Sequence, residues 1–232
     1  MKIGLLGDIH ANSAALTAVL SSARLLEVET LLVTGDLVGY YFSPREVLDM
    51  LREWDAHIVR GNHEDMLIQA ISSPEFLEEV DRRYGSGLRI ALDALEQSDI
   101  EWLSSLPHPK SIKIEDCNIL LCHGAYWDID FYVYPDAQNE LLERCAVKSY
   151  DLVVQGHTHY PMKYKFGDTL LVNPGSVGQP RNRQPGAHWA IFDTNTREVH
   201  MLCEKYDASA IIDASRTIHP ELPYLSEVLL RK

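Results

Sequence analysis

The stretch Lys2-Ile3-Gly4-Leu5-Leu6-Gly7-Asp8-Ile9-His10 joins a short apolar run to an aspartate and a histidine. The run 2–6 has the length and the apolar content of a buried β-strand, and the glycine that follows it indicates a tight turn. In α/β sheets, ligands collect just beyond the carboxyl ends of strands. The stretch therefore predicts a strand that delivers Asp8 and His10 to a site at one edge of a sheet.

Four later segments repeat this order of an apolar run followed by polar side chains. They are Leu32-Val33 before Asp36, Ile58-Val59 before Asn62 and His63, Leu120-Leu121 before His123, and Val153-Val154 before His157 and His159. Each group is weak when taken alone, because Asp-x-His also begins helices and Gly-Asp is common in turns. Five such groups, each after its own strand, favour one shared site.

The side chains of these groups are carboxylates, imidazoles and one amide. Such ligands suit Mn, Fe, Zn, Co or Ni better than calcium, which prefers oxygen alone. His157 and His159 alternate on an extended segment, so they face one side at different heights and suit two adjacent ions. Glycine accompanies almost every group, as tight loops and close backbone approach require: Gly7, Gly35, Gly61, Gly124 and Gly156.

Around these segments, short apolar runs alternate with amphipathic ones, which is typical of an α/β domain. Ser43-Pro44-Arg45-Glu46 matches a capping box with proline at the first helical position. Two packed sheets with helices outside fit this pattern best, and a single doubly wound sheet is the alternative. We expect strands at 2–6, 30–34, 56–59, 110–114, 118–122, 152–155, 162–166, 169–172, 188–192 and 198–203. We expect helices at 13–26, from 43, over most of 64–105, at 137–146 and twice within 208–230.

The chain has 232 residues, of which 46% are hydrophobic and 24% are charged. This length and composition predict one domain over 1–232, with 206–232 as a helical tail packed on it. The start does not resemble a signal peptide and no apolar run has the length of a membrane span, so we expect a cytoplasmic protein without membrane contact. Four cysteines form no CxxC pair and are interpreted as small buried hydrophobic residues.

The formal net charge is -13. Binding to duplex nucleic acid relies on cationic neutralisation of phosphates, so this charge argues against such a partner. A phosphate-containing substrate remains compatible with the charge, because bound metal would supply the attraction locally.

The ordered set GDIH, GD, GNHE, CHG and GHTH resembles the signature of the calcineurin-like metallophosphoesterases. The segments GDLVGYYFSPREVLDML, VRGNHE, GHTHYP and VNPGSVGQPRN are similar to the small single-domain prokaryotic branch of that superfamily. The resemblance covers residues 3–182 and extends to the tail. It implies an α/β (α+β) fold, a double β-sandwich flanked by helices in four αββα layers.

The same resemblance implies roles for individual residues. Asp8, His10 and His159 would bind one ion, Asn62, His123 and His157 the other, and Asp36 would bridge the two. His63 matches the histidine beside the active site that is not a ligand.

The implied reaction is hydrolysis of a phosphodiester or a phosphomonoester by attack of a metal-bridging hydroxide. Asn62 and His63 would contact the substrate and stabilise charge on the phosphoryl oxygens, and His63 would act as the general acid. The residues leave open the native metal, the choice between monoester and diester, and the oligomeric state. A small or nucleotide-like ester fits the acidic charge best.

The sequence departs from the branch in the loop Gly39-Tyr40-Tyr41-Phe42 and in Gly124-Ala125-Tyr126-Trp127, and both departures bring in aromatic residues. Residues 40–42 and 126–134 contain Tyr40, Tyr41, Phe42, Tyr126, Trp127, Phe131, Tyr132 and Tyr134. They form either a stacking platform for a nucleobase or ordinary core and lid packing. Arg181 and Arg183 follow the NPGS segment, where they either meet a phosphate or lie in a solvated loop.

A second function class is a non-catalytic scaffold that uses the same fold for protein contacts, as the retromer subunit of this fold does. The ligand set separates the two classes. Because Asn62, His63, His157 and His159 are all present, we expect an enzyme.

Overall fold

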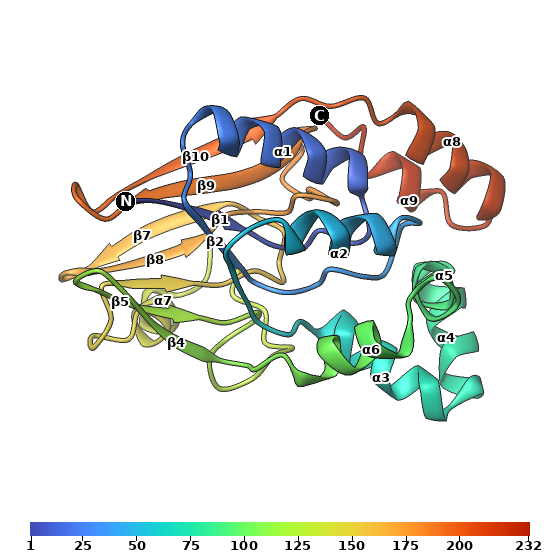
Figure 1. The fold of residues 1–232 in the computed structure, drawn as a ribbon, viewed down its shortest axis with the longest axis horizontal. Coiled ribbons are helices and arrows are strands. Elements are labelled where there is room, and N and C mark those ends of the chain that lie inside the picture. The colour runs from blue at the N-terminus through green and yellow to red at the C-terminus, as the bar shows by residue number, and fades with distance from the viewer.

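The computed structural model describes residues 1–232, in which the apolar runs form two five-stranded sheets packed face to face (Figure 1). The first sheet has the order β10 (Glu198–Glu204), β9 (Ala187–Asp193), β1 (Lys2–Leu6), β2 (Thr30–Val33) and β3 (Ala56–Ile58). The second has the order β4 (Lys110–Ile114), β5 (Cys117–Leu121), β6 (Leu152–Val154), β8 (Thr169–Asn173) and β7 (Met162–Phe166). The double sandwich is confirmed, and the alternative of a single doubly wound sheet is wrong.

Each sheet has three parallel strands. In the first sheet β1, β2 and β3 are parallel, with Leu5 opposite Leu32, and β9 joins β1 in antiparallel register. In the second sheet β5, β6 and β8 are parallel, and β4 and β7 close the two edges in antiparallel register. The carboxyl ends of parallel strands lie at one edge of a sheet, where side chains from different loops can meet.

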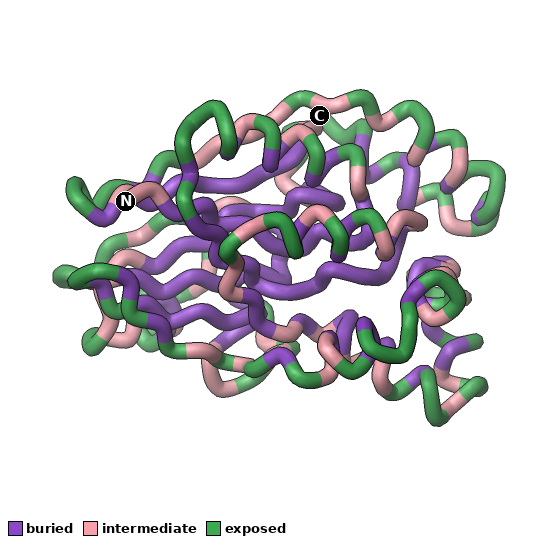
Figure 2. The backbone as a smooth tube through the Cα atoms, in the orientation of Figure 1, coloured by how far each residue is buried: buried purple, intermediate pink, exposed green.

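Side chains alternate between the two faces of each strand, and both faces of the inner strands β1, β2, β6 and β9 are almost entirely buried. Leu5, Leu32 and Phe192 of the first sheet lie in one core with Ile119 and Val154 of the second. Figure 2 shows the strands as a buried central layer beneath more exposed helices. Burying each such side chain stabilises the fold by about 1.5–3 kcal/mol, so the contact between the sheets is a main source of stability.

Helices cover the outer faces of both sheets. On the first sheet, Leu16 and Val19 of α1 (Ser13–Leu25) and Leu48 of α2 (Pro44–Arg52) share a core with Trp189 of β9. On the second, Leu142 of α7 (Asn139–Cys145) packs with that sheet's outer face. Residues 62–105 are mostly helical, as expected: α3 (Asn62–Ser72), α4 (Pro74–Tyr84), α5 (Gly87–Ala94) and α6 (Gln97–Ser105).

The tail contains α8 (Ser209–Ile218) and α9 (Tyr224–Glu227) and packs against the loop after β2. The hydroxyl of Tyr41, which is fully buried, donates a hydrogen bond to the Leu225 carbonyl at 3.0 Å. The Tyr224 hydroxyl donates to the Arg83 carbonyl at 2.9 Å. The tail thus holds both the loop after β2 and the end of α4.

Two local predictions are wrong. The segment that carries His157 and His159 is not extended, because both residues have a positive φ, of 67° and 62°. α2 begins at Pro44 after Ser43, as expected, but the Ser43 side chain makes no hydrogen bond to the helix, so the capping box does not form. The proline has no N–H to satisfy, and its fixed φ already suits the first helical turn. No helix of the chain is both long and apolar enough to cross a membrane.

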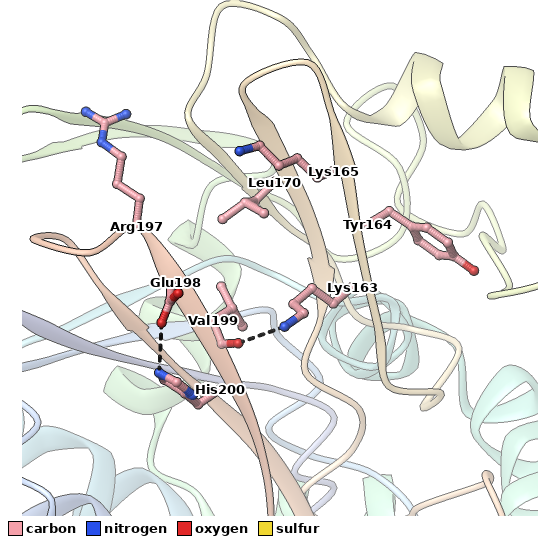
Figure 3. A pocket seen from close by; sticks show the side chains of 8 residues that line it. All are labelled: Lys163, Tyr164, Lys165, Leu170, Arg197, Glu198, Val199 and His200. Carbon is pink, nitrogen blue, oxygen red and sulfur yellow. Dashed lines mark hydrogen bonds and ion pairs between the residues drawn. The ribbon is translucent and has the colours of Figure 1, made fainter.

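A groove of about 450 Å³ lies between β7 and β10, which form edges of the two sheets (Figure 3). The Lys163 ammonium donates to the Val199 carbonyl across it at 3.1 Å, and Arg197 pairs with Asp151 at 2.5 Å. Charged side chains along sheet edges hinder pairing with another chain. The groove contains none of the predicted metal ligands.

Candidate metal centre

Loops at the carboxyl ends of five strands carry the predicted ligands to one place. The loop after β1 carries Asp8 and His10, that after β2 carries Asp36, and α3 begins at Asn62 directly after the loop from β3. In the second sheet the loop after β5 carries His123, and the loop after β6 carries His157 and His159.

Two clusters of potential ligands share one carboxylate. Ligand atoms of Asp8, His10, Asp36 and His159 lie within 4.8 Å of one another, and so do those of Asp36, His123 and His157. Asn62 adjoins the second cluster, because its Oδ1 lies 2.9 Å from the Nε2 of His123. All these side chains are buried except Asn62, which is partly buried.

The Asp36 carboxylate is oriented so that one oxygen faces both clusters. Its Oδ1 accepts a hydrogen bond from the His63 amide at 2.9 Å. Its Oδ2 is buried without any hydrogen-bond partner, 3.6 Å from the Nε2 of His10 and 3.4 Å from the Nε2 of His123. A buried carboxylate oxygen without a partner is costly, and a cation beside it would remove that cost.

Each of the four histidines in the clusters has one ring nitrogen within hydrogen-bond distance of a backbone carbonyl oxygen. Carbonyl oxygens only accept, so the ring nitrogen that faces them carries the proton. The contacts are His10 Nδ1 to Val38 O at 3.2 Å, His123 Nδ1 to Thr34 O at 2.7 Å, His159 Nδ1 to Gln179 O at 2.7 Å, and His157 Nε2 to Asp130 O at 3.2 Å.

The remaining nitrogens then point lone pairs at each other. His10 and His159 meet Nε2 to Nε2 at 3.1 Å, and His123 Nε2 meets His157 Nδ1 at 3.1 Å. Two neutral imidazoles cannot hydrogen bond through two acceptors, whereas a metal ion accepts a lone pair from each. The tautomers set by the backbone therefore fit cation binding in both clusters.

Backbone strain is concentrated in the same loops. Five of the seven predicted ligands have a positive φ: Asp8 at 50°, His10 at 51°, Asp36 at 53°, His157 at 67° and His159 at 62°. Non-glycine residues in this region cost of order 1–3 kcal/mol each when they are strained, and such residues cluster at functional sites. The sequence carried no signal for this strain, because the residue types are chosen for their ligand atoms.

The buried Glu64 carboxylate holds the Asp36 loop. It accepts hydrogen bonds from the backbone amides of Asp36 at 2.9 Å, Leu37 at 2.8 Å, Val38 at 3.3 Å and Gly61 at 2.8 Å. A Cβ on Gly61 would lie 2.2 Å from the Asp36 Oδ1, so only glycine allows this approach. Glu64 is the last letter of GNHE, yet sequence reasoning assigned it no role.

Burial shifts the proton equilibria of both ligand types toward neutral forms. It raises the pKa of Asp8 to about 8 and, together with the charges of Glu64 and Asp8, holds the pKa of Asp36 well above its usual range. It lowers the pKa of His123 and His159 well below the usual range. Cations in the clusters would favour ionised carboxylates and neutral imidazoles.

A cavity of about 150 Å³ opens onto the clusters, with Asp36, Asn62, His63, His157 and His159 on its wall together with Tyr40, Tyr84, Tyr132 and Arg181. His63 is buried and its Nδ1 has no hydrogen-bond partner. The ring lies 4.7 Å from those of His10 and Tyr40 between centroids. Burial, then the charge of Arg181 and the ring of His157, lowers the pKa of His63 to about 3.

Some aromatic residues of the segments 40–42 and 126–134 pack in hydrophobic cores, and others line the cavity. Tyr41 packs against the tail, and Tyr126, Trp127 and Phe131 pack against the core of the second sheet, away from the cavity wall. Only Tyr40 and Tyr132 of the two aromatic groups line the cavity. Tyr84 also lines it, and no sequence pattern marked that residue because it lies in a helix far along the chain from any ligand.

The calcineurin-like phosphoesterase superfamily domain matches residues 1–197. The chain belongs to this superfamily. An uncharacterised protein of Methanocaldococcus jannaschii is 27% identical over 223 residues, 88% of each chain. A metallophosphoesterase from Sphaerobacter thermophilus is 28% identical with a TM-score of 0.80, covering 100% of this chain and 98% of that one.

A hypothetical protein from Pyrococcus horikoshii OT3 shares the calcineurin-like fold, with 24% identity, a TM-score of 0.86, and coverage of 98% of this chain and 97% of that one. Membership of the superfamily implies divalent metal ions and phosphate-ester substrates, and the Asp and His clusters are groups able to bind such ions.

Proposed function

We propose that the protein hydrolyses phosphate esters with two divalent transition-metal ions. Asp8, His10 and His159 would hold one ion, Asn62, His123 and His157 the other, and Asp36 both. The observation that carries the proposal is the unpartnered Asp36 Oδ2, which faces His10 in one cluster and His123 in the other. When bound, the ions would supply Lewis acidity to the phosphoryl oxygens and lower the pKa of water.

The chain's own residues keep the ligand atoms in place. Carbonyls of the loops fix the imidazole tautomers, and the Glu64 carboxylate fixes the turn that presents Asp36. Such outer contacts orient ligands and raise their basicity. A preorganised site of this kind would not need to rearrange as charge develops on the phosphoryl group.

We place Asn62 and His63 at the substrate, since both lie on the cavity wall. His63 is neutral at pH 7 in the free protein, because its pKa is lowered to about 3. A bound phosphate would add the negative charge that favours its protonation, after which the ring would pass a proton to the leaving oxygen. His63→Ala should therefore slow alkyl esters far more than p-nitrophenyl esters, whose leaving group needs no proton. Equal loss on both esters would contradict the acid role.

The decisive experiment is turnover of phosphomonoesters and phosphodiesters by the full chain loaded in turn with Mn, Fe, Zn, Co and Ni. We expect hydrolysis with at least one metal, lost in Asp36→Asn. Absence of turnover on every ester, in protein that binds two ions, would overturn the proposal and favour the scaffold.

A further inference from the structure

Arg181 differs from every other arginine of the chain. The others either pair with a carboxylate or are exposed to solvent. Arg181 is partly buried, and no carboxylate lies within 4.0 Å of its guanidinium. A charge removed from water without a paired counter-charge is costly. No carboxylate of the chain pairs with this guanidinium, so it is available on the cavity wall to a bound anion.

The guanidinium is held by neutral oxygens only. Its Nη2 donates to the Tyr40 hydroxyl at 3.1 Å and to the Gln179 Oε1 at 3.1 Å. Burial raises the pKa of Tyr40 to about 12, so this phenol stays neutral. The two contacts use one nitrogen, and the other donors of the planar fork remain free for a ligand.

The segment that carries Arg181 is anchored to the metal ligands. The Gln179 carbonyl accepts from the His159 ring at 2.7 Å. The Ser176 hydroxyl donates to the Asp8 carbonyl at 2.7 Å and accepts from the Gln179 amide at 2.7 Å. Arg181 is therefore fixed relative to the metal centre by contacts on both sides, rather than carried on a free loop.

The cavity itself limits what can bind there. Its volume of about 150 Å³ is below the roughly 300–1,000 Å³ typical of small-molecule sites. The cavity is lined by three tyrosines, Tyr40, Tyr84 and Tyr132. A phosphoryl group fits such a space, whereas the rest of the substrate must remain at the mouth.

From these observations we propose that Arg181 binds the phosphoryl group of a small phosphomonoester and makes the site prefer monoesters over diesters. This rests on the proposed function. A monoester phosphate carries about 1.5–2 negative charges at pH 7 and presents three terminal oxygens. A diester carries a single charge and has two substituents to place. An additional guanidinium fork therefore favours the monoester, because the fork matches two oxygens at once.

The test compares Arg181→Met with Arg183→Met, a matched control two residues along the chain with an exposed side chain. In manganese-loaded protein, Arg181→Met should lower kcat/KM for the monoester p-nitrophenyl phosphate roughly 10–100-fold. The same substitution should lower kcat/KM for the diester bis-p-nitrophenyl phosphate less than about threefold. Arg183→Met should leave both values unchanged. An equal loss on both esters, or none, would overturn the monoester preference.

Calorimetric titration of inorganic phosphate supplies a readout that needs no turnover. Wild-type protein and Arg183→Met should bind phosphate with the same affinity. Arg181→Met should bind it at least about tenfold more weakly, and the affinity of Arg181→Lys should lie between these values. The metal content should be the same in all four proteins. Unaltered phosphate affinity in both Arg181 variants would refute the assignment. If wild-type protein hydrolyses neither ester yet binds phosphate through Arg181, the proposed hydrolysis fails while the phosphoryl site stands.

Discussion

The two sheets contribute different chemistry to one site. Loops of the first sheet carry every predicted oxygen ligand, Asp8, Asp36 and Asn62, together with His10. Loops of the second sheet carry imidazoles alone: His123, His157 and His159. Both carboxylates therefore come from the first sheet, and three of the four imidazoles come from the second. We therefore expect substitutions in the first sheet to remove carboxylate charge from the clusters, and substitutions in the second sheet to remove imidazoles alone.

The largest effect is expected when the first sheet loses its shared carboxylate. Asp36→Asn should lower the affinity for both ions by at least about 100-fold, because even contacts outside the ligand shell are worth 10–100-fold. His10→Ala should mainly harm one cluster. Metal content after dialysis, measured by mass spectrometry, should thus be lower in Asp36→Asn. Equal content in the two variants would contradict a bridging role.

A smaller loss should follow when the support of that carboxylate is weakened. Glu64→Gln replaces a carboxylate that accepts four backbone amides, so we expect about 10–100-fold weaker metal binding. Glu75→Gln, an exposed residue in the first turn of α4, is the matched control. Competition with a fluorescent chelator measures both. Wild-type affinity in Glu64→Gln would show that the Asp36 loop holds its shape unaided.

In metal-free protein, acid should act with opposite sign on Asp8 of the first sheet and His157 of the second. Burial lowers the pKa of His157 to about 4, although a backbone contact with Asp130 opposes the shift. The unfolded chain, with a pKa of 6.5 at this residue, therefore takes up a proton first, and the free energy of unfolding falls as pH falls from 6.5 to 4. Burial raises the pKa of Asp8 to about 8, so its contribution grows as pH falls from 8 toward 3.8.

Thermal melts between pH 6.5 and 4 can separate these contributions. Asp8→Asn removes the opposing term, so its Tm should fall more steeply with acid than that of wild type. His157→Gln should flatten the fall. We expect differences of roughly 2–4 °C per kcal/mol in a chain of this size. Parallel Tm profiles for all three proteins would contradict the opposite signs.

The smallest effect is expected at the opposite boundary between the sheets, the groove of Figure 3. Lys163→Met removes the hydrogen bond from β7 to the Val199 carbonyl, which should cost about 0.5–1.5 kcal/mol in urea unfolding. Metal content and turnover should not change, because the groove contains none of the ligands. A loss of bound metal would mean that the sheet edges are coupled to the centre.

Strand placement and the convergence of the ligand loops were predictable because both follow from local patterns. An apolar run followed by glycine and a predicted ligand, as from Leu5 to Asp8, predicts both the strand and the residue at which it ends. The two-sheet arrangement fitted the pattern of segments best, but that pattern also allowed a single doubly wound sheet. The failed capping box at Ser43 shows the limit, since the same letters permit a helix start without the side-chain bond.

Features created by packing between distant segments could not be read in advance. Tyr84 reaches the cavity from α4, and Arg181 lies on its wall only because the loop after β8 is tied to Asp8 and His159. Arg181 and Arg183 look alike in the sequence. Only the three-dimensional structure separates an arginine on the cavity wall from one in solvent.

The pairing of β1 with β9 has a consequence for the order of synthesis. Lys2 lies opposite Asp193, so the strand that leads to Asp8 is central in its sheet yet must wait for a partner from near the other end of the chain. Contacts so distant in sequence slow folding, because the intervening loop must close first. On the ribosome, Asp8 and His10 are made long before His157 and His159. The two clusters can be completed only after both segments have emerged and the sheets have formed, which places their completion late in translation.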